Sequence, residues 1–596
     1  MNEKTVRIGG ASGFWGDSSV GAPQLVRHGE IDYLVFDYLA ELTMSLLASA
    51  RLRKPELGYA TDFVTVTMKC VLKDIVERKI RVISNAGGIN PSGCAQALAA
   101  LAAEQGLAVR IAVVEGDDVM PQLPALRESG VREMQGVRPL PDKLVSANAY
   151  LGALPIRQAL DQGAQIVITG RCVDSAVTLG VLMHEFDWQA DDYDRLAQGS
   201  LAGHIIECGC QATGGLHTDW ESVPNWPDIG YPVLECRRDG SFLVSKPAGT
   251  GGLVSTATVG EQVLYEIGDP SAYLLPDVVC DFTQVQLRQA GPDLVEVSGA
   301  RGRMPGNSYK VSATYVDGFR CSAQLCIIGV DAVAKAERTA EAILARTRKL
   351  FDERGSSDYS RTQIEVLGAE ASFGPHAVTH HSREVIMRLA VMHPDQAALD
   401  LFAREVSAAG TSWSPGTVGL GGGRPSSSPS IRQYAFLLDK GALTPGVVVD
   451  GVRTPVMIPT YTAITVEDKR AAVPEKIVNS DRSERDVLEV PLIRLAYGRS
   501  GDKGDISNIG LISRRPEYLP VLRAEVTAER VADWLGHLVK GPVTRYDLPG
   551  FDALNFVCEA ALDGGGMASL RNDSLGKGMA QILLTMPVPT PVVLLS

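Results

Sequence analysis

The fold is decided by the stretch Thr5-Val-Arg-Ile-Gly-Gly-Ala-Ser-Gly-Phe-Trp-Gly-Asp17, in which a short apolar run of β type stops in a loop of small and polar residues. Four later stretches repeat this layout, and they begin at Tyr33, Arg81, Val109 and Gln165. Short apolar strands that alternate with helical segments are typical of a parallel sheet covered on both faces. Ligands of such sheets bind beyond the carboxyl ends of the strands. The loops after these strands are therefore the expected site.

The chain has 596 residues, which is too long for a single core. We predict an α/β protein with a mostly parallel, Rossmann-like sheet domain over residues 1–280 and a smaller α+β unit over 281–460. A polar linker over 461–489 and a ferredoxin-like α+β domain over 490–596 complete the chain.

Shorter patterns give three local predictions. Two strands, over 309–316 and 320–330, are expected to form a hairpin around Asp317-Gly318, because Asp-Gly pairs favour tight turns. Charged and apolar residues at helical spacing predict helices over 332–354 and 394–408. The C-terminal domain is expected to end with a strand over 580–586.

The bulk composition excludes several classes of partner. A net charge of -13 and a pI near 5.3 argue against binding to a nucleic-acid backbone, which requires basic surface. No apolar run reaches the ~18 residues of a transmembrane helix, and the first residues lack the apolar core of a signal peptide. Because the ten cysteines are scattered, we expect reduced thiols and a cytoplasmic protein without membrane or nucleic-acid partners.

Several blocks in the same order carry a family resemblance. They are Ile8-Gly-Gly-Ala-Ser-Gly-Phe-Trp-Gly-Asp17, Ser84-Asn-Ala-Gly-Gly-Ile-Asn-Pro91, Thr169-Gly-Arg-Cys-Val-Asp-Ser175, Gly203-His-Ile-Ile-Glu-Cys-Gly-Cys-Gln-Ala-Thr-Gly-Gly215 and Gly249-Thr-Gly-Gly-Leu-Val-Ser255. Together they resemble the acyclic terpene utilisation protein A family. The segment Gly498-Arg-Ser-Gly-Asp-Lys-Gly-Asp-Ile-Ser-Asn-Ile-Gly510 resembles the ferredoxin-like domain that often follows that core.

The resemblance implies an activity on CoA thioesters. Family members are associated with bacterial breakdown of citronellol and geraniol, alongside acyl-CoA carboxylases and hydratases. The implied step is a lyase reaction that releases acetate from a 3-hydroxy-3-isohexenylglutaryl-CoA. An acyl-CoA carboxylase of the same pathway is the implied protein partner.

Four residues are candidates for catalysis. Arg171 can hold a carboxylate or phosphate with its planar fork, and Asp174 can act as a base or cap the next helix. An Arg-Asp pair that only orders the loop is the alternative. Glu207 and Cys208 stand beside Cys210 and His217, so a catalytic carboxylate or thiol, a metal site and an ordinary packed loop all remain open.

Thirteen residues are candidates for binding the substrate or its CoA group. After the first and third strands, glycines can present backbone N–H groups to an anion and amides can hold a carbonyl, although turns and helix capping explain the same residues. Lys246 precedes a glycine-rich helix start suited to phosphate. Charged residues near 500 form either a self-paired turn or a clamp on the main site. These candidates are Gly10, Ser12, Gly13, Asp17, Asn85, Gly87, Gly88, Asn90, Lys246, Gly251, Gly252, Arg499 and Lys503.

The leading functional hypothesis is an acyl-CoA lyase in which Asp174 or Glu207 takes a hydroxyl proton and Arg171 or loop N–H groups hold the developing negative charge. An enoyl-CoA hydratase, a noncatalytic acyl-CoA-binding or assembly subunit, and hydrolysis through Cys208 or Cys210 are the alternatives. We expect no tightly bound cofactor, with CoA present as part of the substrate; a divalent metal is possible, although no residue is assigned as its ligand. A homo-oligomer is expected.

Overall fold

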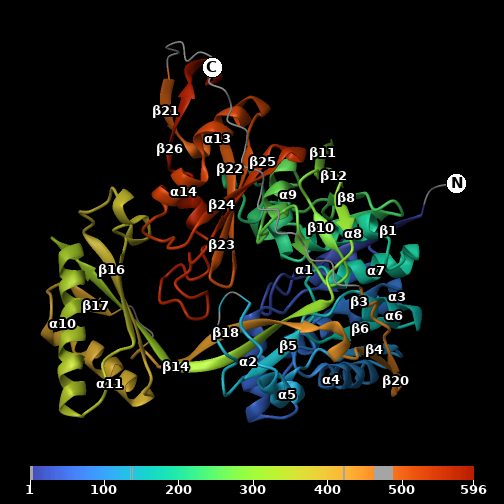
Figure 1. The fold of residues 1–596 in the computed structure, drawn as a ribbon, viewed down its shortest axis with the longest axis horizontal. Coiled ribbons are helices and arrows are strands. Elements are labelled where there is room, and N and C mark those ends of the chain that lie inside the picture. Colours follow the sequence, from blue (N-terminus) through green and yellow to red (C-terminus); the bar gives the residue numbers. More distant parts are fainter. Residues whose placement is uncertain (1–3, 135, 137, 420–422, 462–486, 596) are drawn as a thin grey trace.

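The computed structural model describes residues 4–134, 136, 138–419, 423–461 and 487–595. Figure 1 shows three parts: a main body built on a large sheet, an outer lobe formed by residues 319–419, and a C-terminal domain formed by residues 487–595. Residues 462–486 of the expected linker lie outside the described residues.

The main sheet has eleven strands among the residues that the structure describes, and five parallel strands form its centre. They are β1 (Thr5–Gly10), β2 (Tyr33–Phe36), β3 (Arg81–Ser84), β6 (Ile166–Thr169) and β4 (Ile111–Glu115), in that spatial order. The five strands expected from the sequence are confirmed. Their order starts at one side of the parallel group and does not wind outward from a central first strand, so the finer Rossmann-like arrangement is not confirmed.

Antiparallel strands extend the sheet on both sides. Beside β1 lie β7 (Val233–Arg237), β8 (Phe242–Ser245), β12 (Leu294–Ser298) and β11 (Gln286–Gly291); beside β4 lie β19 (Gly446–Val449) and β20 (Val452–Pro455). Residues 281–460 are therefore divided between the main body and the outer lobe.

Helices cover both faces of the parallel strands. One apolar core joins alternate strand residues to α1 (Gly21–His28), α3 (Lys69–Arg78) and α4 (Pro91–Glu104). The other core joins the opposite strand residues to α6 (Leu154–Asp161), α7 (Ala176–Phe186) and α8 (Tyr193–Ile206). Burial on both faces explains why these strands are continuously apolar.

One long strand, β14 (Ser308–Ile328), links the main body to the outer lobe. Its first half pairs with β5 (Ser146–Ala149) and β18 (Ser428–Asp439), whereas its second half pairs with β16 (Glu384–His393) and β17 (Thr417–Gly419). The expected hairpin around Asp317-Gly318 is wrong. Gly318 has a φ of +74° at a register shift against β18, so the Asp-Gly pair forms a bulge where the strand changes partners.

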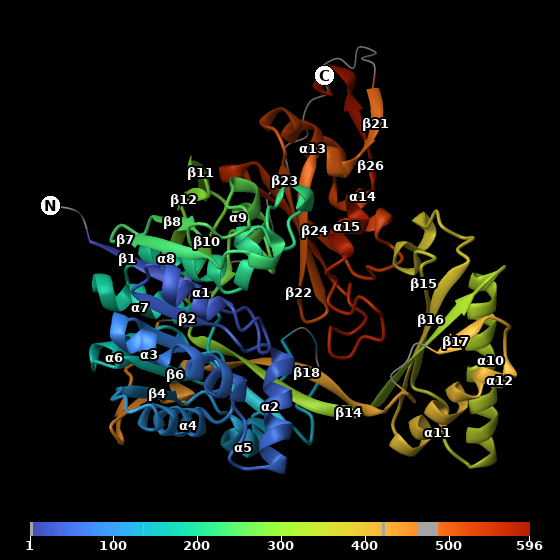
Figure 2. The same cartoon turned by 180° about the vertical axis from the view of Figure 1, so that it is seen from behind.

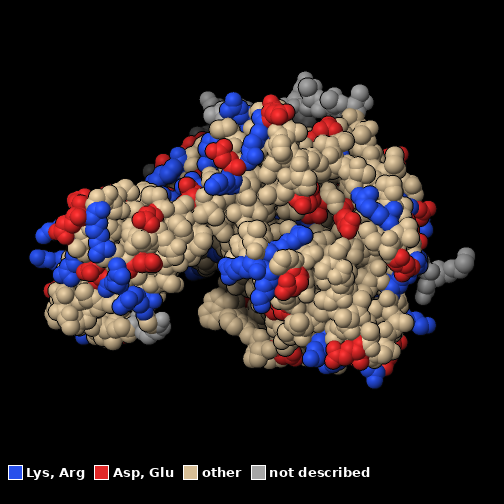
Figure 3. All heavy atoms as spheres, turned by 90° about the horizontal axis from the view of Figure 1, so that it is seen from below, with Lys and Arg blue, Asp and Glu red and all other residues tan. Residues whose placement is uncertain are grey.

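The outer lobe contains the two helices expected there, α10 (Ala332–Glu353) and α11 (Gln396–Ser407), together with β15 (Arg361–Leu367). From below, acidic and basic side chains are interspersed over the lobe and the main body (Figure 3). No helix among the described residues combines the length and the apolar character that crossing a membrane requires.

The C-terminal domain has a four-stranded antiparallel sheet in the order β22 (Ala496–Lys503), β23 (Ile506–Ser513), β25 (Ala553–Cys558) and β24 (Val543–Leu548). Its short helices are α13 (Leu519–Glu525), α14 (Ala528–Trp534) and α15 (Met579–Leu583), and β21 (Val487–Pro491) pairs with β26 (Pro587–Pro591). The strand expected over 580–586 is wrong, because α15 occupies most of it. Met579 and Ile582 lie three residues apart and are both buried, which is helical spacing.

The C-terminal domain contacts the outer lobe as well as the main body (Figure 2). His376 of the lobe stacks on Trp534, with ring centroids 3.6 Å apart, and Arg361 forms an ion pair with Asp563. Because β14 also joins the lobe to the main body, the three parts form a closed ring of contacts.

Candidate functional site

Charged and aromatic side chains gather at the carboxyl ends of the parallel strands. We call this group the strand-end cluster: Asp37, Glu41, Tyr150, Arg171, Asp174, His204, Glu207, Lys310 and Lys503. Their charges act on one another, although they come from strand ends, two helices, the long strand β14 and the C-terminal domain. The position is the one expected for a ligand site of a parallel sheet.

Asp37 follows strand β2 and is fixed by Asn85, which follows β3. The Asn85 Nδ2 group donates a hydrogen bond to Asp37 Oδ1, and Asn85 Oδ1 accepts one from the Tyr38 N–H at 2.7 Å. Burial, with repulsion from Asp174, raises the pKa of Asp37 well above its ordinary value. Asp37 is therefore a carboxyl group that retains its proton more readily than usual.

Arg171 lies at the centre of the cluster. Its Nη1 atom donates to Asp174 Oδ1 at 2.7 Å and to the Cys172 carbonyl at 2.9 Å, and its guanidinium carbon lies 4.0 Å from the centroid of the Tyr150 ring. The Nε atom is buried and has no hydrogen-bond partner among the described residues. Buried donors in proteins are almost always paired. An unpaired buried donor such as this nitrogen is therefore available to bind a ligand.

Glu41, Tyr150 and Lys310 form one side of the cluster. Glu41 begins α2 (Glu41–Arg53), and its Oε1 atom accepts from the Tyr150 hydroxyl at 2.6 Å and lies 3.5 Å from Lys310 Nζ. Burial acts to raise the pKa of Glu41, but Lys310 and Arg171 lower it below the ordinary value. Glu41 is thus a paired, ionised carboxylate that holds Tyr150 and Lys310 in place.

His204 and Glu207 form an acid-base pair at the end of α8. His204 Nδ1 lies 3.0 Å from Glu207 Oε1, and the buried His204 Nε2 atom has no partner among the described residues. Burial acts to lower the pKa of His204, yet the charge of Glu207 raises it overall; burial likewise raises the pKa of Glu207, against the opposing effect of His204. Both groups can therefore gain or lose a proton at a pH closer to neutral than the pH at which an exposed carboxylate does so.

Comparison with known proteins identifies two regions of the chain. The model of the acyclic terpene utilisation family protein AtuA matches residues 6–449, and that of the AtuA ferredoxin-like domain matches residues 490–589. The chain belongs to the AtuA family. Membership indicates involvement in acyclic terpene utilisation. The strand-end cluster draws residues from both matched regions. No curated protein and no solved structure matches the chain.

Cys208 and Cys210 are poorly suited to nucleophilic attack. Burial raises the pKa of Cys208 well above its ordinary value and that of Cys210 to about 12. The thiolate, and not the thiol, is the reactive species. Across the described parts of the chain, no group of three or more His, Cys, Asp or Glu side chains is placed to hold a metal ion.

The loop after β1 borders the cluster and a separate cavity. A Cβ atom on Gly10 would lie 2.5 Å from the Ile206 carbonyl oxygen, and one on Gly13 would lie 2.8 Å from Cys208, so both glycines allow close packing against the end of α8. Ser12 and Asp17 line a cavity of about 170 Å³ together with Tyr38, Asp62 and Thr67. Asp17 Oδ2 accepts from the Gly13 N–H at 2.9 Å, which orders the loop.

Of the candidates after β3, only Asn85 lies in contact with the cluster. A Cβ atom on Gly87 would lie 2.4 Å from the Thr169 carbonyl oxygen, and Gly88 has a φ of +53°. Asn90 caps α4, because its Oδ1 atom accepts from the Gly93 N–H at 3.1 Å. These three residues therefore shape the loop.

The Lys246 region makes a turn of its own. Lys246 Nζ donates to the Thr250 carbonyl at 2.9 Å and lies 3.0 Å from Asp293 Oδ2. The N–H groups of Gly251 and Gly252 donate to backbone carbonyls at 2.7 and 2.9 Å. These donors are occupied within the protein, and no hydrogen bond or ion pair among the described residues joins them to the strand-end cluster.

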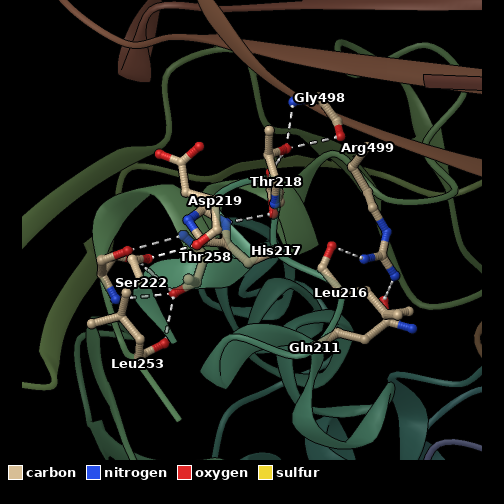
Figure 4. A network of polar contacts seen from close by, with 12 residues as sticks. Gln211, Leu216, His217, Thr218, Asp219, Ser222, Leu253, Thr258, Gly498 and Arg499 are labelled. Atoms are coloured by element: carbon tan, nitrogen blue, oxygen red, sulfur yellow. Dashed lines mark hydrogen bonds and ion pairs between the residues drawn. The ribbon is translucent and has the colours of Figure 1, made fainter. Parts of the chain in front are cut away.

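Arg499 joins the C-terminal domain to the main body (Figure 4). It donates to the Leu216 carbonyl at 3.1 Å and to Gln211 Oε1 at 2.5 Å. Beside it, the Gly498 N–H donates to Thr218 Oγ1 at 3.0 Å. Arg499 is therefore occupied by protein groups, in contrast to Lys503 further along the same strand.

Five members of the cluster are not among the candidates chosen from the sequence: Asp37, Glu41, Tyr150, His204 and Lys310. His204 could have been found, because it stands three residues before Glu207 in a helix and such residues share a face. Lys310 could not, since only the path of β14 brings it to Glu41.

Proposed function

We propose that this protein is an acyl-CoA lyase that cleaves a carbon–carbon bond in a branched 3-hydroxyacyl-CoA, of the 3-hydroxy-3-isohexenylglutaryl-CoA type. The observation that carries the proposal concerns two buried nitrogens of the strand-end cluster, Arg171 Nε and His204 Nε2, which have no hydrogen-bond partner among the described residues. Glu207, the carboxylate that pairs with His204, has a raised pKa. Such a group offers a base and a cation to one ligand.

In the proposed reaction, Glu207 takes the proton of the tertiary 3-hydroxyl group. The carbon–carbon bond to the carboxymethyl arm then breaks, the hydroxyl oxygen becomes a ketone carbonyl, and the electron pair moves to the departing CH2 group. The His204–Glu207 pair returns the proton to this carbon, which gives acetate and a 3-oxoacyl-CoA. Atoms and charge balance without any added reactant.

Glu207 is a better candidate for the base than Asp174. Asp174 Oδ1 lies 2.7 Å from Arg171 Nη1. The Asp174 carboxylate therefore serves to fix the guanidinium group. Glu207 is held only through Oε1, by His204, and its Oε2 atom has no hydrogen bond to another described residue. A base with a raised pKa also has a larger driving force for proton abstraction.

Arg171 is suited to stabilise the departing group. A carboxymethyl group that leaves with an electron pair carries additional negative charge, and a buried, fixed cation lowers the energy of that state more than a solvated one does. The Tyr150 ring and Asp174 hold the guanidinium in place before the reaction. Preorganisation of this kind avoids reorganisation during the bond cleavage.

Product analysis with synthetic CoA esters tests the proposal. The full-length protein is incubated with a branched 3-hydroxyglutaryl-CoA and, separately, with the corresponding enoyl-CoA, and the products are identified by mass spectrometry. We expect free acetate and a 3-oxoacyl-CoA from the first. Water addition to the enoyl-CoA alone would indicate a hydratase, and binding without turnover of either ester would indicate a noncatalytic acyl-CoA-binding subunit.

A further inference from the structure

Lys503 is carried to the strand-end cluster by a hairpin of the C-terminal domain. It ends β22, and the next residue, Gly504, makes the turn into β23 with a φ of +65°. Both ribbon views show this hairpin directed toward β14 and β18, beside a loop of its own domain (Figures 1 and 2). The Leu562 and Gly564 N–H groups of that loop donate to Asp505 Oδ1 in the turn, at 3.1 and 2.9 Å. Lys503 thus lies at the tip of a β-hairpin, not on a long loop.

The hairpin is fixed near its tip, at the Gly501–Asn508 pair, against the end of α9 (Thr256–Val263). Asn508 Nδ2 donates to the Leu264 carbonyl at 2.6 Å, and Asn508 Oδ1 accepts from the Glu266 N–H at 2.9 Å. A Cβ atom on Gly501 would lie 2.6 Å from Glu266 Cγ, so the strand runs directly against this segment. These contacts set where the hairpin tip lies.

Two carboxylates at the hairpin, those of Glu266 and Asp502, already have a cation. Lys577 Nζ lies 3.1 Å from Glu266 Oε1 and 2.9 Å from Asp502 Oδ1. Lys503 itself is exposed and makes no hydrogen bond or ion pair with another described residue. Its charge nevertheless acts on Tyr273, Glu266, Asp174 and Glu41, and on the His204–Glu207 pair.

We propose that Lys503 binds an anionic group of the substrate, so that the C-terminal domain completes the active site of its own chain. The inference rests on the proposed function for the identity of the substrate, but it concerns binding and not bond cleavage. An ammonium group is a compact donor suited to a carboxylate or a phosphate. A CoA thioester of a dicarboxylic acid offers both, as the free carboxylate of the acyl chain and the phosphates of CoA.

Anion binding to the full-length protein tests this role. Calorimetric titrations with glutarate and with pyrophosphate are compared for the wild type, Lys503→Gln, Lys503→Arg and the control Lys540→Gln. Lys540 is an exposed lysine of the same domain that donates to the Gly536 carbonyl at 2.8 Å. We expect Lys503→Gln to weaken binding of one anion by about tenfold or more, Lys503→Arg to retain most of it, and Lys540→Gln to leave it unchanged.

The anion that loses affinity identifies the group that Lys503 holds. Equal affinities of the wild type and Lys503→Gln for both anions, or no saturable binding of either anion to the wild type, would overturn the inference. Equal thermal unfolding of the variants excludes a loss of folding. If Lys503→Gln loses anion binding while the wild type cleaves no thioester, the inference stands and the proposed reaction fails.

Discussion

The outer lobe and the strand-end cluster both bury an arginine beside a carboxylate, but they differ in how completely the buried polar atoms are hydrogen-bonded. In the lobe, Arg388 pairs with Glu365 and donates to the Leu570 carbonyl at 2.7 Å, while both Glu365 oxygens accept from the Asn572 N–H at 3.0 Å. In the cluster, Arg171 Nε and His204 Nε2 have no partner among the described residues. A saturated network holds parts of the protein together, whereas an unsaturated one is available to a ligand.

The largest expected effect comes from Glu207→Gln. This change keeps the shape of the side chain but removes the proposed base, so turnover of a cleavable thioester should fall by about 10³-fold. Stability should not fall at neutral pH, because burial disfavours the ionised form of Glu207. Steady-state kinetics and chemical unfolding measure the two quantities.

Glu104→Gln serves as the matched control for that variant. Glu104 is an exposed residue at the end of α4, and its replacement should change neither turnover nor stability. Turnover of Glu207→Gln within about threefold of the wild type would remove Glu207 from the mechanism.

Arg388→Met, in the outer lobe, should lower stability, which Glu207→Gln should leave unchanged. The change leaves Glu365 as a buried carboxylate without its cation, which should lower the free energy of unfolding by about 4 kcal/mol. The double variant Arg388→Met with Glu365→Met should recover most of this loss, since the uncompensated charge is gone. Urea unfolding of the three proteins checks this; if the single variant were as stable as the wild type, the pair would have no role in joining the lobe to the C-terminal domain.

Asp277→Asn should change how stability depends on pH. Burial raises the pKa of Asp277 to about 6, so its contribution is fully present below an unfolded-state pKa of about 4 and is lost as the pH rises toward 6. In the wild type, Asp277 Oδ2 accepts a hydrogen bond from the Ala153 N–H at 2.9 Å, and the asparagine of the variant can accept the same bond. The wild type should therefore lose up to about 3 kcal/mol more than the variant between pH 4 and 7. Unfolding midpoints measured across this range decide the point, and parallel pH profiles would contradict it.

Cys208→Ser should have the smallest effect. Because burial raises the pKa of this thiol, little thiolate exists at neutral pH, and turnover should change by less than about threefold. Alkylating reagents should also leave activity intact. A loss of about 100-fold in the serine variant would instead support thiol-based hydrolysis.

The sequence was sufficient for those parts of the fold that depend on local pattern. The five parallel strands could be predicted because both faces of each are buried, which makes them continuously apolar. Asp317-Gly318 was misleading, since a left-handed glycine serves a bulge as well as a turn. The choice between them depends on β16 and β18, which lie far away in the sequence.

The same limit applies to the site. Arg171, Asp174 and Glu207 could be chosen because they stand at strand or helix ends, where ligands bind. Strand-end position alone could not separate Asn85, which holds Asp37, from Asn90, which caps a helix. Nor could it show that the Gly251 and Gly252 N–H groups are used by backbone carbonyls.

The most direct test of the central claim is a crystal structure of the full-length protein with a non-cleavable thioether analogue of a branched 3-hydroxyglutaryl-CoA. We expect the acyl group in the strand-end cluster, with its oxygens within hydrogen-bond distance of Arg171 Nε and His204 Nε2. An acyl group bound elsewhere, for example at the Lys246 turn, with both nitrogens still unpartnered, would contradict the account.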